Sequence, residues 1–109
     1  MSFDWADFLT FADALVRDPK SPGPEEASLR SAISRAYYAA FHVARNFGWD
    51  RREFTLTGTG HDHWLVMNYF RSSPDRTRRK IGVDLDRLYD NRTSADYDDV
   101  LTGRPVALA

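Results

Sequence analysis

The feature that most constrains the fold of this chain is a helical repeat of apolar side chains over residues 29–47. Apolar residues recur there at spacings of three and four for about five turns, which is the periodicity of an amphipathic α-helix. A helix of this length needs other elements to cover its apolar face, so the repeat predicts a packed helical domain. The repeat comprises Leu29, Ala32, Ile33, Ala36, Tyr37, Ala40, Phe41, Ala44 and Phe47.

Three other segments carry the same spacing and are predicted as helices. The first covers about residues 3–17, the third begins near His61, and the fourth opens near Pro74. No β-type alternation of useful length occurs in the sequence. The sequence therefore predicts an all-α fold, an up-and-down antiparallel bundle of four main helices. After Ser94, where glycine and proline interrupt the chain, we expect only a short turn or a truncated C-terminal fifth helix.

Helix boundaries are predicted from capping signals. Pro24 fits the first position of the long helix, with two acids following it in the first turn, and Gly48 is the predicted end. Thr59, followed three residues later by Asp62, resembles a capping box at the start of the third helix. Gly82 is expected to weaken the fourth helix locally.

Composition limits the classes of function. The 109 residues fit a single domain, residues 1–109, and 42% hydrophobic residues are enough for a packed core. The absence of cysteine excludes disulfides, thiolate metal sites and a cysteine nucleophile. No basic region precedes the first apolar segment, and no apolar run approaches the roughly 20 residues of a membrane span. We therefore expect a cytoplasmic protein without a membrane partner.

A basic run lies at the start of the predicted fourth helix. The net charge is −1, yet Arg76, Arg78, Arg79 and Lys80 fall within five residues. Such a local patch is compatible with contacts to RNA phosphates even when the net charge is near zero. The alternative is a solvated helix start without a ligand. The sequence leaves both interpretations open.

A polar stripe marks the other side of the long helix. At about 100° per residue, Arg35, Tyr38, His42 and Asn46 lie within about 80° of one another, opposite the apolar face. As structure, such a stripe is a contact with another helix or with a dimer partner. As chemistry, His42 would move a proton at a ribose 2′-hydroxyl while Arg35 stabilises charge on the phosphate. Tyr38 and Asn46 would place the substrate. About 10 Å of helical rise separates Arg35 from His42, so a second subunit would help to complete such a site.

The other candidate residues carry weaker signals. His61 and His63 lie at a helix start, but helical positions two apart point away from each other, which argues against a shared metal ion. We expect both histidines to be exposed, and no cofactor is predicted. Arg92 and Asp96 form an i,i+4 pair beside the apolar face of the fourth helix. If partly buried, this pair would fix the fourth helix against the tyrosines of the long helix.

Three stretches together resemble the HEPN domain family in its short, stand-alone prokaryotic form. The stretch LRSAISRAYYAAFHVAR is similar to the signature helix of that family. The stretch GTGHDHWLVMNYF resembles a helix start at which the family often has a histidine after a threonine or serine. The third stretch, LYDNRTSADYDD, matches the family pattern through Leu88, Arg92, Ala95, Asp96 and Tyr97. The matches cover most of residues 27–99, in the family's order.

The resemblance implies a helical bundle that dimerises. Many members are metal-independent ribonucleases with an arginine and a histidine four to six residues apart. They act as toxins or in phage defence, beside a minimal nucleotidyltransferase partner, whereas other members bind nucleotides, RNA or protein without cutting. Arg35 and His42 satisfy the nuclease spacing, with six residues between them.

Two departures from the family pattern favour a non-catalytic role. The nuclease motif usually lies in a later helix and has a polar residue after its arginine, whereas Ala36 follows Arg35. Members usually continue past the Asp-Tyr into another long helix, and its absence would leave an apolar groove for a partner. The sequence thus predicts a homodimeric, non-catalytic binding or assembly module of a toxin–antitoxin or defence system. The alternative is a metal-independent endoribonuclease that uses Arg35 and His42.

Overall fold

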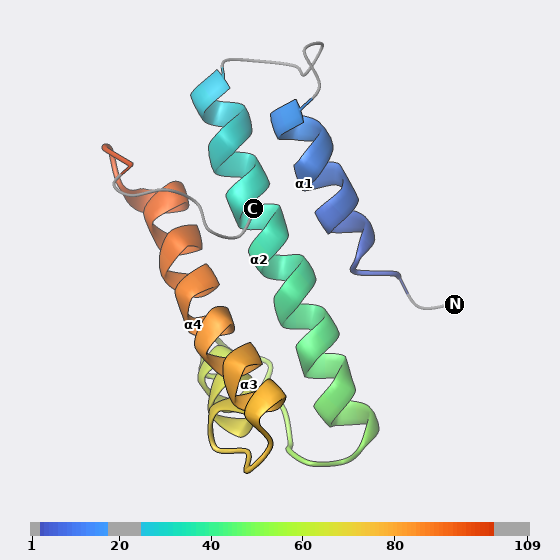
Figure 1. The fold of residues 1–109 in the computed structure, drawn as a ribbon. Helices are drawn as coiled ribbons and strands as arrows, with labels where there is room; N and C mark the ends of the chain where they lie inside the picture. Colours follow the sequence, from blue (N-terminus) through green and yellow to red (C-terminus); the bar gives the residue numbers. More distant parts are fainter. Residues whose placement is uncertain (1–2, 18–24, 102–109) are drawn as a thin grey trace.

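The computed structural model describes residues 3–17 and 25–101, which contain four α-helices and no strand (Figure 1). The helices are α1 (Asp7–Arg17), α2 (Glu25–Asp50), α3 (His61–Arg71) and α4 (Arg76–Tyr97). The predicted all-α fold is confirmed, and α2 is the long helix that the apolar repeat predicted. Two acids occupy the first turn of α2, where the positive end of the helix dipole favours them.

Helix α2 lies between α1 on one side and α4 on the other (Figure 1). Trp5, just before α1, stacks on His42, whereas Ala12, further along α1, packs with Ala32. The start of α1 therefore lies beside the second half of α2, and the two helices are antiparallel. The contacts between the helices confirm a helical bundle.

Helix α4 is antiparallel to α2 as well. Arg78, near the start of α4, lies over the ring of Phe47, whereas Ala95, near the end of α4, accepts a hydrogen bond from Arg30. Both α1 and α4 thus begin beside the C-terminal half of α2. Each packs along α2, and neither packs extensively against the other.

Helix α3 departs from the predicted up-and-down order, because it runs parallel to α2. His63, near the start of α3, contacts Tyr37, and Phe70, near its end, packs on Phe47. Tyr37 and Phe47 are separated by about 15 Å of helical rise, so the two helices advance in the same direction. The cause is the segment 51–60, which leaves the end of α2 and returns along it with two apolar side chains in the core.

The core consists of two clusters on either side of α2. One joins α1 to the first half of α2, and the other joins α2 to α3 and α4. Gly82 lies in the contact between α3 and α4, where a Cβ would come within 2.5 Å of the backbone nitrogen of Arg71. The glycine thus allows the two helices to pack closely, which explains its place in the middle of a helix. The buried cluster members are Ala12, Ala32 and Ala36 in the first cluster, and Ala44, Val66, Phe70 and Leu85 in the second.

Helix α2 is longer than predicted. Gly48, the expected end, lies inside the helix, which continues to Asp50. The ring of Phe54 packs onto Gly48 and would collide with any Cβ there. This glycine is required by close packing and not by a turn. The predicted start of the helix, Pro24, lies outside the described residues. The expected break after Ser94 is wrong, because α4 continues to Tyr97 and no separate helix follows it within residues 98–101.

The predicted capping box at α3 is wrong. The N-cap of α3 is Gly60, and Asp62 accepts hydrogen bonds from the backbone of Thr57 and Gly58, at 2.7 and 2.8 Å. Burial acts to raise the pKa of Asp62, but these hydrogen bonds outweigh it and lower the pKa. Asp62 thus fixes the returning segment to the start of α3.

No helix among the described residues combines the length and the apolar character needed to cross a bilayer.

Candidate functional site

The predicted polar stripe of α2 lies against the N-terminal region of the chain. The guanidinium carbon of Arg35 is 5.0 Å from the centroid of the Phe8 ring, within cation–π distance. The imidazole of His42 stacks on Trp5, with ring centroids 3.6 Å apart and planes within 8° of parallel. Arg35 is exposed and His42 is half-buried. The two side chains of the predicted catalytic pair thus each have an aromatic ring of the N-terminal region as a neighbour.

His42 has a fixed orientation and a lowered pKa. Its Nδ1 lies 2.8 Å from the carbonyl oxygen of Tyr38, so Nδ1 carries the proton and donates it. Burial lowers the pKa of His42, and this effect outweighs the hydrogen bond to Tyr38. Asn46, the last member of the stripe, accepts from the guanidinium of Arg45 at 3.0 and 3.1 Å. Three of the four stripe residues, Arg35, His42 and Asn46, therefore contact either other residues of α2 or the aromatic rings of the N-terminal region.

Arg92 of α4 is surrounded by three tyrosine rings. Its guanidinium carbon lies 5.6 Å from the centroid of Tyr37, 5.7 Å from Tyr38 and 5.3 Å from Tyr89. Its Nη1 lies 3.3 Å from Oδ2 of Asp96, and the Arg92 side chain is only 15% exposed. A partly buried Arg92–Asp96 pair therefore fixes α4 against the tyrosines of α2.

Tyr38 connects the two predicted pairs. Its ring centroid is 6.0 Å from that of His42, and the guanidinium carbon of Arg92 is 5.7 Å from the same centroid. Ser34, one turn earlier on α2, donates a hydrogen bond to Asp96 at 3.4 Å. Residues predicted separately from α2 and from α4 are thus connected through Tyr38 and Ser34. Tyr97 is 74% exposed near the end of α4.

His63 was predicted to be exposed, and that prediction is wrong. The side chain is half-buried, its Nδ1 lies 2.8 Å from the hydroxyl of Tyr37, and its ring stacks on Tyr89 at 3.8 Å. Burial lowers the pKa of His63 more strongly than the nearby acids of α4 raise it. Burial also raises the pKa of Tyr37. The Nε2 of His63 and the Nε of Arg92 are buried without a hydrogen-bond partner among the described residues.

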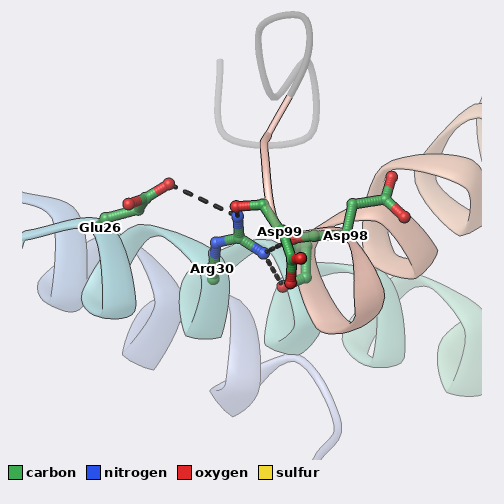
Figure 2. A network of polar contacts seen from close by, with 5 residues as sticks. Glu26, Arg30, Asp98 and Asp99 are labelled. Carbon is green, nitrogen blue, oxygen red and sulfur yellow. Dashed lines mark hydrogen bonds and ion pairs between the residues drawn. The ribbon is translucent and has the colours of Figure 1, made fainter.

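Arg30 is a residue to which the sequence analysis assigned no role (Figure 2). From α2, its Nη1 donates to the carbonyl oxygens of Ala95 and Asp98, at 3.0 and 2.5 Å, and its Nη2 donates to that of Asp99 at 3.1 Å. Glu26, one turn earlier, lies 3.5 Å from the same guanidinium. Arg30 therefore caps the C-terminal end of α4, where carbonyl groups lack intrahelical partners. Its position next to Leu29, the first residue of the apolar repeat, is the feature of the sequence that could have indicated a contact with another helix.

The basic run occupies the first turns of α4. Asp75 is the N-cap and accepts from the backbone N–H of Arg78 at 2.9 Å. Arg79 donates to two carbonyl oxygens of the preceding turn, and Lys80 pairs with a carboxylate one turn later. Arg76 is exposed. Contact of this run with RNA phosphates stays a prediction.

Two hollows lie on opposite sides of α2 in the described part of the chain. Val43 borders one hollow and Ser34 borders the other. These two residues are nine positions apart, and at about 100° per residue they point to opposite sides of the helix axis. The first hollow, the apolar groove, has a volume of about 720 Å³ and is lined by Leu9, Ala36, Ala39, Ala40, Val43, Ala44, Phe47 and Ile81, among others. The second hollow, the polar pocket, has a volume of about 710 Å³ and is lined by Phe11, Leu15, Arg30, Ser31, Ser34, Arg35 and Asp96, among others.

Residues 3–17 and 25–101 contain no group of three histidine, aspartate or glutamate side chains that could hold a metal ion. Comparisons with protein-family models, with curated proteins and with solved structures found no match to this chain. The resemblance to the HEPN family therefore rests on the three matched stretches within residues 27–99.

Proposed function

We propose that this protein is a non-catalytic assembly module that forms a homodimer through the apolar groove. The observation that carries the proposal is the exposure of large apolar side chains along the groove. Leu9 is 50% exposed, Val43 is 53% exposed and Ile81 is 39% exposed. They come from three different helices and line one surface. Contiguous exposed apolar surface of this kind marks a contact with another protein.

The shape of the groove suits a helix. Its floor consists of alanines of α2, which are short and mostly buried, so that a helix in the groove would meet mainly the exposed Val43, while α1 and α4 form the two walls. Packed helices lie about 8–10 Å apart, and the smaller distances require small side chains at the contact. The alanines of the floor are Ala36, Ala39, Ala40 and Ala44.

The charges beside the groove favour a second copy of the same chain as the occupant. The α1 region carries Asp4, Asp7 and Asp13 against Arg17, whereas the first turns of α4 carry four basic side chains after Asp75. Both regions begin at the same end of α2. A two-fold axis along α2 therefore brings the acidic α1 of each copy opposite the basic start of α4 in the other.

The packing of the predicted catalytic pair supports a non-catalytic role. Arg35 contacts Phe8 and His42 stacks on Trp5, so both side chains help to hold the N-terminal region on α2. The resemblance to the HEPN family adds the biological setting, a toxin–antitoxin or defence system. In that setting the dimer would assemble with a nucleotidyltransferase-type protein or with RNA.

Sedimentation equilibrium tests the homodimer. The wild-type chain is expected at about twice its mass of 12.5 kDa. Val43→Glu places a charge on the exposed floor of the groove and is expected to give a monomer. The control is Val83→Glu, because Val83 is 46% exposed on α4 but does not line the groove. A monomeric wild type, or a dimeric V43E variant, would contradict the proposal.

Incubation with single-stranded RNA in EDTA tests the absence of catalysis. The wild-type protein is expected to leave the RNA intact, because the imidazole of His42, which would have to move the proton, is stacked on Trp5 and its Nδ1 is bound to the carbonyl oxygen of Tyr38. If RNA is cleaved, and both Arg35→Ala and His42→Ala abolish the cleavage, the protein is a metal-independent endoribonuclease instead.

A further inference from the structure

The polar pocket has an apolar wall and a polar wall. Helix α1 supplies the apolar wall through Leu15 and through Phe11, which is 52% exposed. Helix α2 and the end of α4 supply serine hydroxyls, two arginines and Asp96. The volume of about 710 Å³ lies within the range of roughly 300–1,000 Å³ that is typical of small-molecule sites. The pocket therefore suits a ligand with one apolar part and one polar part.

Of the two arginines that line the pocket, Arg35 is the one that a ligand can use. The guanidinium of Arg30 is occupied by the carbonyl groups at the end of α4. The guanidinium of Arg35 is exposed, lies over the Phe8 ring, and has no carboxylate or carbonyl partner among the described residues. Ser31, one turn before Arg35 on the same face of α2, is exposed as well. Together they present donors to an anion.

The charge of the pocket selects a monoanion. Asp96 also lines it, with a side chain that is 32% exposed and paired with Arg92. A phosphate monoester carries roughly −1.5 to −2 charges at pH 7 and would bring the second charge toward this carboxylate. A carboxylate carries a single charge, and its two oxygens match the planar fork of the Arg35 guanidinium.

We propose that the polar pocket binds a small amphipathic monocarboxylate, whose carboxylate contacts Arg35 and Ser31 and whose apolar body lies on Phe11 and Leu15. This arrangement gives the exposed Phe11 ring an apolar neighbour and the Arg35 guanidinium a counter-ion. The pocket lies across α2 from the apolar groove, so ligand binding and dimer formation are separate properties of the chain.

Two-dimensional ¹H–¹⁵N NMR with octanoate as the probe tests the site. Saturable shifts are expected at the amides of Phe11, Ser31 and Arg35. Octan-1-ol has the same apolar chain without the charge, and we expect it to bind at least about tenfold more weakly. Octyl phosphate is expected to bind more weakly than octanoate. Absence of octanoate binding, tighter binding of octyl phosphate, or shifts confined to Val43 and Ile81 would overturn the proposal.

Two variants locate the carboxylate. Arg35→Gln removes the charge at an exposed position and is expected to weaken octanoate binding about tenfold. Arg87→Gln removes the same charge from an exposed position on α4 outside the pocket, and octanoate should bind this variant as it binds the wild type. Ser31→Asp introduces a second carboxylate and is expected to abolish binding. Wild-type affinity in either R35Q or S31D would show that the anion is held elsewhere.

Discussion

At the scale of single residues, the half-buried histidines make the stability of the chain depend on pH. Burial lowers the pKa of His63 from 6.5, and the pKa of His42 is lowered in the same way. In the unfolded chain both side chains titrate near 6.5 and bind protons that the folded chain excludes. The free energy of unfolding is therefore expected to be highest above this pH and to fall as the pH decreases below it.

We predict that the urea midpoint of the wild type falls between about pH 7 and about pH 5, and that it falls less in His63→Gln, which cannot titrate. His61→Gln is the matched control, because His61 is exposed two residues earlier on α3. Urea unfolding followed by circular dichroism at several pH values measures the effect. An H63Q variant with the full pH dependence of the wild type would show that His63 is not the group responsible.

Sequence spacing predicts single-residue contacts only when both partners are close in the chain. Arg92 and Asp96 are one helical turn apart, so their pairing could be predicted from the spacing alone. The hydroxyl that contacts His63 belongs to Tyr37, 26 positions earlier. The first carbonyl that Arg30 caps is 65 positions away. No local pattern carries such information, which is why the burial of His63 and the contacts of Arg30 were not predicted.

At the scale of helices, Arg30 of α2 determines how α4 ends. The last carbonyl groups of a helix need partners outside it, and the guanidinium of Arg30 supplies one for Ala95 in the last turn of α4 and also binds the carbonyl oxygens of Asp98 and Asp99, which follow the helix (Figure 2). The positive charge also lies at the negative end of the α4 dipole. Removing the guanidinium is therefore expected to release the last turn of α4 from α2.

We predict that Arg30→Met, which keeps an apolar stem but no donors, lowers the free energy of unfolding by about 1–2 kcal/mol. Amide hydrogen exchange should accelerate at the last turn of α4. The control is Glu26→Ala, which removes only the ion pair to a carboxylate that is 66% exposed, and its cost should be below about 0.5 kcal/mol. If E26A costs as much as R30M, the ion pair and not the cap is the stabilising contact.

The existence of the helices was predictable from the sequence, but the direction of α3 relative to α2 was not. Each helix carries its own apolar repeat, which is local information. The parallel course of α3 depends on the segment 51–60, whose path is fixed by Phe54 on Gly48 and by Asp62 on Thr57. These contacts form only after the chain has folded back. Gly48 was predicted to end α2, but it lies inside the helix, where the ring of Phe54 from the returning segment packs onto it.

At the scale of the whole molecule, the order of the helices leaves the apolar groove open. Because α1 and α4 both pack along α2 and not extensively against each other, a groove remains between them, in which Val43 of α2 is 53% exposed. The resemblance to the HEPN family implied an apolar groove where members of that family have a further helix. The structure accounts for the groove in another way, by the spacing of α1 and α4 around α2. The homodimer itself stays a prediction.

The unequal charge of the two walls allows the orientation of the proposed dimer to be tested. Arg78 lines the groove on α4, and Asp7 follows Ala6, which lines it on α1. With the two-fold axis along α2, Asp7 of one copy lies near the basic start of α4 in the other. Asp7→Lys and Arg78→Glu should each weaken the dimer about tenfold at low salt, because each places like charges together. The double variant restores opposite charges and should dimerise within about threefold of the wild type. Sedimentation equilibrium measures all four dissociation constants. A double variant that dimerises more weakly than either single variant would exclude this orientation. If α2 of the two copies were antiparallel, α1 would face α1 and α4 would face α4, so residue 7 of one copy would not meet residue 78 of the other.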